Sequence, residues 1–401
     1  MTSVADLDLP DFNFSDPDLI GETYHRRLAA LRQQSWLARS PIAVLVLDRA
    51  AGEFFLRARA TAFPGREIAE LFGITAGPLF EHVRANILNL SDATHRRLRS
   101  IVAGAFTPVA ANQWRPVMRQ ILEQLWAGPE KDGRTEIVAA LAKPYPALTI
   151  ATILGAPPTD APRLHNWSTW VQRQFDIRAL STELARIEAA VVETYDYVEA
   201  LLARAPDPST LLGALLAAEA DGERLSHVEC VNLAVNVLAG AIDTTQSQLS
   251  HGLYLLATHP DQWALLDTSP GLVPAAVSEV LRVEPVTPFT ARLCLSDVEY
   301  RGVVFPAGTI VAICAERANR EGEGGERFDI TAGPDSRLLT FGAGPHYCLG
   351  ANLARAELEE ALRFLAPRMP GLTLDGPVSF GGIEGIYGIE ALPLRWSAAV
   401  A

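Results

Sequence analysis

The stretch FGAGPHYCLG, residues 341–350, surrounds a single cysteine with three glycines, a proline and a histidine. Its glycines permit left-handed backbone and close approach, and Pro345 stiffens the middle of the loop. Apolar residues at helical spacing run from Leu349 to Leu365, so Cys348 stands directly before the start of a helix. The dipole and the free N–H groups at a helix start favour a thiolate. This pattern predicts that Cys348 is a thiolate ligand of a metal.

The same loop has room for a large, flat group beside the sulfur, because glycines stand at positions 342, 344 and 350. A metal held by a thiolate under a planar group fits a haem iron, for which cysteine is one known proximal ligand. A buried structural cysteine is the alternative, and it is the common state of an isolated cysteine. The ten-residue pattern F-G-x-G-x-H-x-C-x-G is long and specific, so it favours the iron ligand.

Composition argues against several other classes of protein. The chain has 401 residues, of which 49% are hydrophobic, enough for a large core. A net charge of −13 argues against nucleic acid as the main partner. The four cysteines, at 230, 294, 314 and 348, show neither CxxC pairs nor zinc spacing, which suits a reducing compartment. With neither a signal-peptide pattern nor a charge-free apolar run of about 20 residues, we expect a soluble cytoplasmic protein without a membrane anchor.

The elements that must position the cysteine loop are mostly helical. Alanine- and leucine-rich sequence from about residue 65 to 283 predicts a helical body. Residues 228–260 form its longest helical candidate, and much of it is apolar on every side, which is typical of a buried central helix. Strand patterns stand at 42–47, 298–315 and 385–396. The predicted fold class is therefore mainly α with a minor β-sheet portion.

In these motifs the chain resembles a cytochrome P450 of the soluble bacterial class, and the resemblance covers nearly the whole sequence. It implies a cytochrome P450 fold, a single large domain over residues 1–401 with an extended N-terminal segment at 1–20. A long central helix would lie over a buried haem b whose iron is bound by Cys348, with O2 as co-substrate. The other haem contacts implied around the cysteine are Phe341, Gly342, Leu349, Gly350 and Ala354.

A second motif, HRRLR, places His95 and Arg99 four residues apart on one face of a helix. Cationic and N–H donors suit the two propionates of a haem. A histidine taken alone is more often solvated or packed in a core. The resemblance nevertheless implies that His95, Arg99, Arg292 and His346 bind the propionates.

A third motif, SEVLR, places Glu279 and Arg282 three residues apart, where they can pair on a helix. Such a pair is usually exposed and contributes little. The resemblance implies instead a buried structural network with Arg327 as its third member. This network would hold the haem side of the fold and do no chemistry.

The central helical stretch contains GAIDTTQ, which is unusually polar for its surroundings. Threonine can hydrogen-bond the carbonyl one turn back and bend a helix, and an opened turn can hold water or oxygen. A mere irregularity of the helix is the alternative. The resemblance implies that Asp243 relays protons and that Thr244 hydrogen-bonds the bound dioxygen. Ala241 stands where the family usually has glycine, and it should narrow the oxygen groove slightly.

Substrate contacts can be placed by register only, and core packing is the equal alternative for each. The set is apolar with few hydroxyls, as ligand pockets usually are, and suggests a mid-sized apolar molecule such as a terpene, steroid, polyketide or aromatic metabolite. Its members are Ile87, Leu88, Leu238, Ala239, Ile242, Val286, Thr287, Pro288, Phe289, Ile386 and Tyr387.

Electrons must come from separate proteins, a ferredoxin and its reductase, because no flavin or ferredoxin domain is recognisable in the chain. A basic patch on the cysteine side could dock an acidic ferredoxin, although ordinary solvated arginines are the alternative. We expect a monomer. The patch would consist of Arg96, Arg97, Arg355 and Arg363.

The leading functional prediction is a ferredoxin-dependent haem-thiolate monooxygenase that hydroxylates or epoxidises its substrate. A peroxide-driven haem enzyme is one alternative, but it would not need an Asp243–Thr244 relay. Oxidative coupling or cyclisation on the same haem is another, and the sequence does not separate it from hydroxylation. A haem-binding sensor or carrier is the non-enzyme alternative, and the same relay argues against it.

Overall fold

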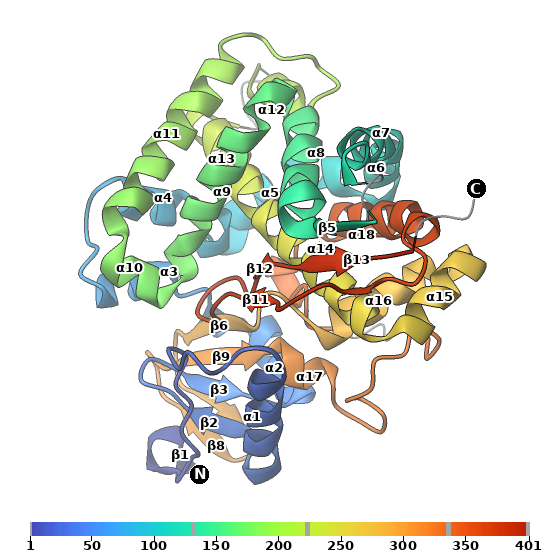
Figure 1. Ribbon diagram of the computed structural model, residues 1–401. Helices are drawn as coiled ribbons and strands as arrows, with labels where there is room; N and C mark the ends of the chain where they lie inside the picture. Colours follow the sequence, from blue (N-terminus) through green and yellow to red (C-terminus); the bar gives the residue numbers. More distant parts are fainter. Residues whose placement is uncertain (1, 130–132, 221–224, 334–337, 398–401) are drawn as a thin grey trace.

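The computed structural model describes residues 2–129, 133–220, 225–333 and 338–397, and helices dominate it (Figure 1). This confirms the predicted fold class. The α-helices are α1 (Gly21–Gln34), α2 (Arg49–Arg57), α3 (Gly65–Leu71), α4 (Pro78–Ala85), α5 (Asp92–Ala103), α6 (Pro108–Gln113), α7 (Arg115–Trp126), α8 (Pro144–Leu154), α9 (Ala161–Gln172), α10 (Ile177–Thr182), α11 (Leu184–Leu202), α12 (Leu211–Ala220), α13 (His227–Ala241), α14 (Asp243–Thr258), α15 (Pro260–Thr268), α16 (Val273–Val283), α17 (Ala315–Asn319) and α18 (Ala351–Leu365).

The sheets are small and gather strands from distant parts of the chain. The largest has the order β2-β3-β9-β6-β4, in which β3 and β9 are parallel and the other neighbours antiparallel. It lies at the lower side of Figure 1, beside α1 and α2. The strands are β1 (Thr2–Ser3), β2 (Leu37–Arg39), β3 (Val44–Val46), β4 (Thr61–Ala62), β5 (Arg134–Glu136), β6 (Phe289–Cys294), β7 (Val298–Tyr300), β8 (Val303–Phe305), β9 (Ile310–Cys314), β10 (Thr373–Leu374), β11 (Ser379–Phe380), β12 (Ile389–Ala391) and β13 (Pro393–Arg395).

The central helical stretch is two helices rather than one. Helix α13 starts at a capping box, in which the Ser226 hydroxyl accepts from the Glu229 N–H while the Glu229 carboxylate accepts from the Ser226 N–H. It ends at Ala241, and α14 begins at Asp243. The helical ladder is therefore interrupted at Ile242, inside the GAIDTTQ motif. The opened turn expected from the sequence is present, and it divides the helix completely.

The N-terminal segment is anchored by aromatic packing. Residues 2–20 hold the short strand β1 and a turn of 3₁₀-helix at Val4–Asp6, and are otherwise irregular. The Phe12 and Phe14 rings both pack against Phe289 of β6, with centroids 5.6 Å and 4.9 Å away. Burying these rings joins the segment to the largest sheet.

Helix α1 is held by a buried charge network. The two ring nitrogens of His25 each lie 2.9 Å from a carboxylate, Glu284 after α16 and Glu316 in α17. Burial alone would lower the pKa of His25, but these two carboxylates outweigh it and raise the pKa to about 9. Arg320, which also contacts Glu316, opposes part of this effect.

We expect this histidine to make stability depend on pH. The folded pKa lies above the unfolded value near 6.5, so the stabilisation is complete below about pH 6.5 and is lost as pH rises through about 9. The loss is at most about 3 kcal/mol. Urea unfolding across this window should show the decline in wild type, and His25→Gln should flatten it. His227→Gln is the matched control, because His227 also lies between two carboxylates but is half exposed. An unchanged slope in His25→Gln would contradict the assignment.

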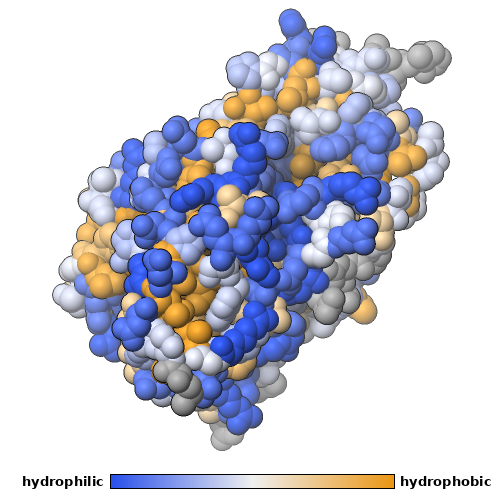
Figure 2. Space-filling model, turned by 90° about the horizontal axis from the view of Figure 1, so that it is seen from below, coloured by the Kyte–Doolittle hydropathy of each residue, from blue (hydrophilic) through white to orange (hydrophobic). Residues whose placement is uncertain are grey.

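The surface on the sheet side is mostly hydrophilic, with small hydrophobic patches between charged and polar residues (Figure 2). Within the described ranges, no helix combines the length and the apolar character needed to cross a membrane.

Candidate active site

The cysteine loop folds back on itself before α18. The Cys348 N–H donates to the Phe341 carbonyl at 2.9 Å, which closes the loop. Gly342 and Gly344 both have positive φ, at 71° and 72°, and a Cβ on Gly344 would lie 2.8 Å from the Leu56 carbonyl oxygen. Glycine is therefore required at 344 on both conformational and steric grounds.

The Cys348 side chain faces open space at the start of α18. Cys348 is exposed, whereas Cys230, Cys294 and Cys314 are buried. A Cβ placed on Gly350 would meet nothing within 4 Å. This is the room beside the sulfur that the loop's glycines predicted.

The electrostatics of Cys348 differ from the expectation of a free thiolate. The surrounding protein raises the pKa of the thiol above its ordinary value, although the N–H groups of Gly350 and Ala351 and the Arg99 guanidinium act to lower it. The helix start therefore contributes as expected, but desolvation outweighs it. A coordinated metal ion would deprotonate the thiol outright.

Four cationic or N–H-bearing side chains gather near this loop. The rings of His95 in α5 and His346 have centroids 4.2 Å apart, and an Arg99 Nη donates to the Tyr347 carbonyl. Burial and the neighbouring His95, Arg292 and Arg99 lower the pKa of His346 to about 3. The structure therefore brings together the four residues that the family resemblance implied as propionate ligands.

Arg292 is the most unusual member of this cluster. It is buried on β6, and burial lowers its pKa to about 10. Among the described residues, Arg292 donates to the Ala291 carbonyl and Arg99 to the Tyr347 carbonyl, and neither guanidinium forms an ion pair with a carboxylate. A buried guanidinium without an anion is costly, so a ligand with acidic groups fits here.

These residues fit a haem. Cys348 would offer the sulfur ligand of the iron, and the porphyrin itself would supply the nitrogen ligands, so no further metal-binding side chain is needed. The two propionates would provide the anions that Arg99 and Arg292 lack. Among the other predicted haem contacts, Phe341 and Leu349 are half-buried, consistent with a face that remains open beside the loop.

The interrupted turn between α13 and α14 exposes its carbonyl side. The Thr244 hydroxyl donates to the Gly240 carbonyl at 2.8 Å, and the Ser168 hydroxyl of α9 donates to the Ala239 carbonyl at 2.9 Å. These bonds occupy carbonyls at the break in the helical ladder. Gly240 is exposed although both Ala239 and Ile242 are buried, and a Cβ on Gly240 would meet nothing within 4 Å. The turn therefore faces open space.

Asp243 is held in a form that retains its proton more readily than an ordinary aspartate. Burial raises the pKa of Asp243, while Arg173 and Lys143 act to lower it. This is the direction needed by a carboxyl that both binds and releases a proton near neutral pH.

Glu279 and Arg282 form the predicted pair. The guanidinium binds the carboxylate through two bonds of 2.7 Å and 2.8 Å, and both side chains are largely buried. The prediction for Arg327 needs correction: its carbonyl oxygen, not its side chain, accepts from Arg282 at 2.6 Å, and the residue itself is exposed. A second guanidinium beside the pair would leave an uncompensated charge, whereas a carbonyl completes the donors of Arg282.

Several predicted substrate contacts are also corrected. Leu238, Ile242 and Tyr387 are at most 1% exposed, so they face no cavity. The positions that are not buried lie one residue away. They include Val237, Gly240 and Ala241 at the end of α13 and Thr244 at the start of α14. The Tyr387 hydroxyl is engaged with the Gly21 N–H at 2.6 Å. Three more of the predicted contacts, Ala239, Val286 and Pro288, are also buried. Phe289 packs against Phe12 and Phe14 of the N-terminal segment. Those that stay partly exposed are Ile87, Leu88, Thr287 and Ile386.

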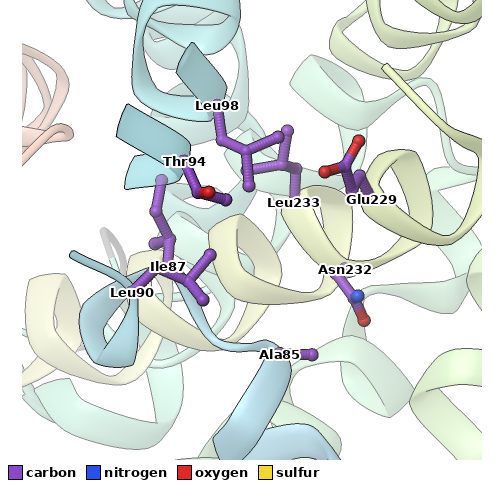
Figure 3. Close-up of a pocket in the computed structure, with 8 residues that line it drawn as sticks. All are labelled: Ala85, Ile87, Leu90, Thr94, Leu98, Glu229, Asn232 and Leu233. Carbon is purple, nitrogen blue, oxygen red and sulfur yellow. The ribbon is translucent and has the colours of Figure 1, made fainter. Parts of the chain in front are cut away.

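A cavity of about 180 Å³ lies between α4, α5 and α13 (Figure 3). Of the residues that line this cavity, the sequence reasoning named only Ile87. Thr94 and Leu98 in α5, and Glu229 and Leu233 in α13, stand four residues apart and so share one face of their helix. This spacing could have identified both lining faces. The lining residues are Ala85, Ile87, Leu90, Thr94, Leu98, Glu229, Asn232 and Leu233.

The predicted basic patch is weaker than its sequence suggests. Arg97 pairs with Glu229, and Arg363 lies within 3.5 Å of both Glu359 and Glu360. Arg355 donates to Ser278 and stacks over the Phe341 ring. Arg96 is exposed on α5.

Comparison with known proteins agrees with this geometry. The family model described as cytochrome P450 matches residues 167–266 and 271–365. Luteothin monooxygenase from Streptomyces thioluteus is 34% identical over 398 residues, which cover 98% of this chain and 97% of that protein. Mycinamicin IV hydroxylase/epoxidase from Micromonospora griseorubida is 33% identical over 325 residues, covering 79% of this chain and 77% of that one. The crystal structure of CalO2 matches with a TM-score of 0.89 at 31% identity, covering 98% and 100% of the two chains. The chain therefore belongs to the cytochrome P450 family and is an oxidoreductase of the P450 monooxygenase type.

Proposed function

We propose that this enzyme activates O2 at a haem b held by Cys348 and inserts one oxygen atom into a mid-sized apolar molecule of secondary metabolism, by hydroxylation or epoxidation. The observation that carries the proposal is the exposed thiol of Cys348 near Arg99, with Arg292 near His346 of the same loop. Neither arginine has a carboxylate partner among the described residues. The names of the luteothin and mycinamicin relatives support both the reaction and the kind of substrate.

The residues around the haem site have separate roles. A bound haem supplies the redox chemistry that activates O2. Cys348 would bind its iron through the sulfur, while Arg99, Arg292 and the two histidines would bind its propionates. Because Arg292 is buried on a strand of the largest sheet, it fixes the orientation of the group rigidly.

The turn between α13 and α14 delivers protons. Asp243 holds a proton at its carboxyl oxygen and passes it toward the open side of the turn. The Thr244 hydroxyl donates to the Gly240 carbonyl, and a rotation of this side chain would let it hold or donate a proton on the open side of the turn instead. The hydrogen bond to the Gly240 carbonyl thus keeps the Thr244 hydroxyl at the interrupted turn.

Electrons reach the site from a separate ferredoxin and its reductase, docking on the cysteine side near Arg96 and Arg355. A test of the whole proposal supplies these two proteins, NADH and O2 labelled with heavy oxygen. One labelled atom per product molecule is the expected result. A dimeric or cyclised product without label would support oxidative coupling instead, and turnover with peroxide but none with O2 would support the peroxide-driven alternative.

We expect Asp243→Asn to lower product formation by about 100-fold, because it removes the carboxyl that relays protons. Thr244→Ala should keep NADH consumption but lower the product formed per NADH, since the hydroxyl that directs the proton is lost. The measurement is product and NADH followed in the same reaction. Thr245→Val is the control, because Thr245 is buried and next in sequence. Equal yields in Thr244→Ala and wild type would contradict this role.

A further inference from the structure

A chain of buried hydrogen bonds leads to the cavity between α4, α5 and α13. Gln174, in the turn after α9, lies with its Nε2 3.2 Å from the Nε2 of His82 in α4. The other ring nitrogen of His82 lies 3.1 Å from the hydroxyl of Tyr195 in α11. That hydroxyl lies 2.8 Å from the Oδ1 of Asn232 in α13. Four elements of the fold thus converge on one amide.

The donor and the acceptor of every hydrogen bond in this series follow from one backbone carbonyl, that of Val171. The Gln174 amide nitrogen also donates to the Val171 carbonyl at 2.9 Å, so this atom must be the NH2 group. It therefore donates to His82 Nε2, which must be the unprotonated nitrogen. Burial lowers the pKa of His82 to about 4, so the ring is neutral and carries its proton on Nδ1.

The same logic fixes the amide of Asn232. His82 Nδ1–H donates to the Tyr195 oxygen, and the Tyr195 hydroxyl then donates to Asn232 Oδ1. The NH2 group of Asn232 is left on the other side of the amide. In the described part of the chain this group has no hydrogen-bond partner, and Asn232 lines the cavity (Figure 3). Asn232 thus brings an amide, whose oxygen is occupied by Tyr195, to the edge of a space walled mainly by Ile87, Leu90, Leu98 and Leu233.

We propose that Asn232 is a specificity-determining residue, which donates from its NH2 group to a carbonyl, ester or ether oxygen of the substrate. Tyr195 and His82 are positioning residues that prevent the amide from turning over. The inference rests on the proposed function, because it makes this cavity part of the substrate site.

The geometry of α13 also limits the size of the substrate. Asn232 precedes Gly240 by eight residues, which is about 12 Å along a helix. Both residues lie beside open space, the first at the cavity and the second at the turn proposed to deliver protons. We therefore expect substrates in which the oxygen bound by Asn232 and the oxidised carbon are on the order of 12 Å apart.

The test uses probes that bind the haem iron directly, so that no substrate need be known. One series of N-alkylimidazoles ends in a methyl ketone, and a matched series of equal chain length ends in an alkyl group. Titration followed by the Soret shift gives the affinity of each. Wild type should prefer the ketone at the chain length that spans about 12 Å. In Asn232→Leu that preference should fall by about tenfold, while binding of the alkyl series is unchanged.

Two further variants separate the donor from its support. Asn232→Asp keeps the shape but replaces the donor with an acceptor, and should lose the preference as well. Tyr195→Phe frees the amide to turn over and should lose part of it. Tyr197→Phe is the matched control, since it removes a phenol hydroxyl from the same helix α11, where that hydroxyl donates to Asp160 Oδ2 at 2.7 Å outside the cavity and outside this chain of bonds.

The outcomes are distinct. Equal ketone preference in wild type and Asn232→Leu, with normal Soret shifts, would overturn the role of Asn232 and leave the haem-thiolate function standing. A preference lost equally in Tyr197→Phe would also overturn it. The absence of a Soret shift with either series would remove the proposed function itself, and this inference with it.

Discussion

We expect Cys348→Ser to abolish the strongly red-shifted Soret band of the reduced, carbon monoxide-bound protein. A serine hydroxyl is not ionised under these conditions, so it cannot replace the thiolate whose electron density produces the shift. Product formation should fall by more than about 100-fold, the upper end of losses caused by changes that touch only a ligand's neighbours. The measurement is the optical spectrum of the reduced protein with carbon monoxide, for wild type and variant side by side.

Cys294→Ala is the control for this substitution, because Cys294 is buried on β6. The red-shifted band should remain in this variant. A Soret band at its ordinary position in the wild-type protein would sink the assignment, and Cys348 would then be a structural cysteine. A red-shifted band that persists in Cys348→Ser would require a different ligand.

Glu279→Ala should lower the free energy of unfolding by about 3–5 kcal/mol. The substitution leaves the largely buried Arg282 guanidinium without its carboxylate and also removes the acceptor of the Asp329 N–H at 2.9 Å. Urea unfolding followed by circular dichroism gives the value. We expect loss of haem binding on the same timescale as unfolding, because Arg282 also holds the carbonyls of Gly325 and Arg327.

The chain contains a matched control with the same spacing. Glu81 and Arg84 of α4 also stand three residues apart, with the charged atoms 3.3 Å apart, but their side chains are 67% and 58% exposed. Glu81→Ala should change stability by less than about 0.5 kcal/mol. Similar losses of unfolding free energy in the two variants would show that burial does not explain how much the Glu279–Arg282 pair stabilises the fold.

Local chemistry explains why much of the site could be predicted. The cysteine loop is a short segment in which glycine, proline and the following helix constrain the backbone directly, so its form depends little on the rest of the chain. The same holds for the capping box at Ser226 and Glu229 and for the threonine that bonds the Gly240 carbonyl. The clustering of His95, Arg99, Arg292 and His346 was inferred from family resemblance, since three of these segments are far apart in sequence.

The open face of α13 was poorly predicted, because it depends on the exact register of the helix and on the elements that surround it. Successive residues of a helix point about 100° apart, so an error of one residue in register exchanges a buried side chain for an exposed one. Leu238 and Ile242 were expected at the pocket and are buried, whereas Val237 and Ala241 lie on the open face. Apolar composition does not distinguish the two faces when a helix is surrounded by protein on most sides.

The sequence by itself predicted the mainly helical fold, the paired Glu279–Arg282 and the polar turn in the central helix, which the structure shows, and it also supplies the proposal that Cys348 is the iron ligand. Each is a short pattern whose chemistry is complete within a few residues. Only the tertiary structure decided which face of α13 is open, which group completes the bonds of Arg282, and how the amide of Asn232 is turned. These depend on contacts among distant segments, such as the Val171 carbonyl that orients a chain of bonds ending in another helix. Packing and hydrogen-bond direction are properties of the assembled neighbours, and no local pattern contains them.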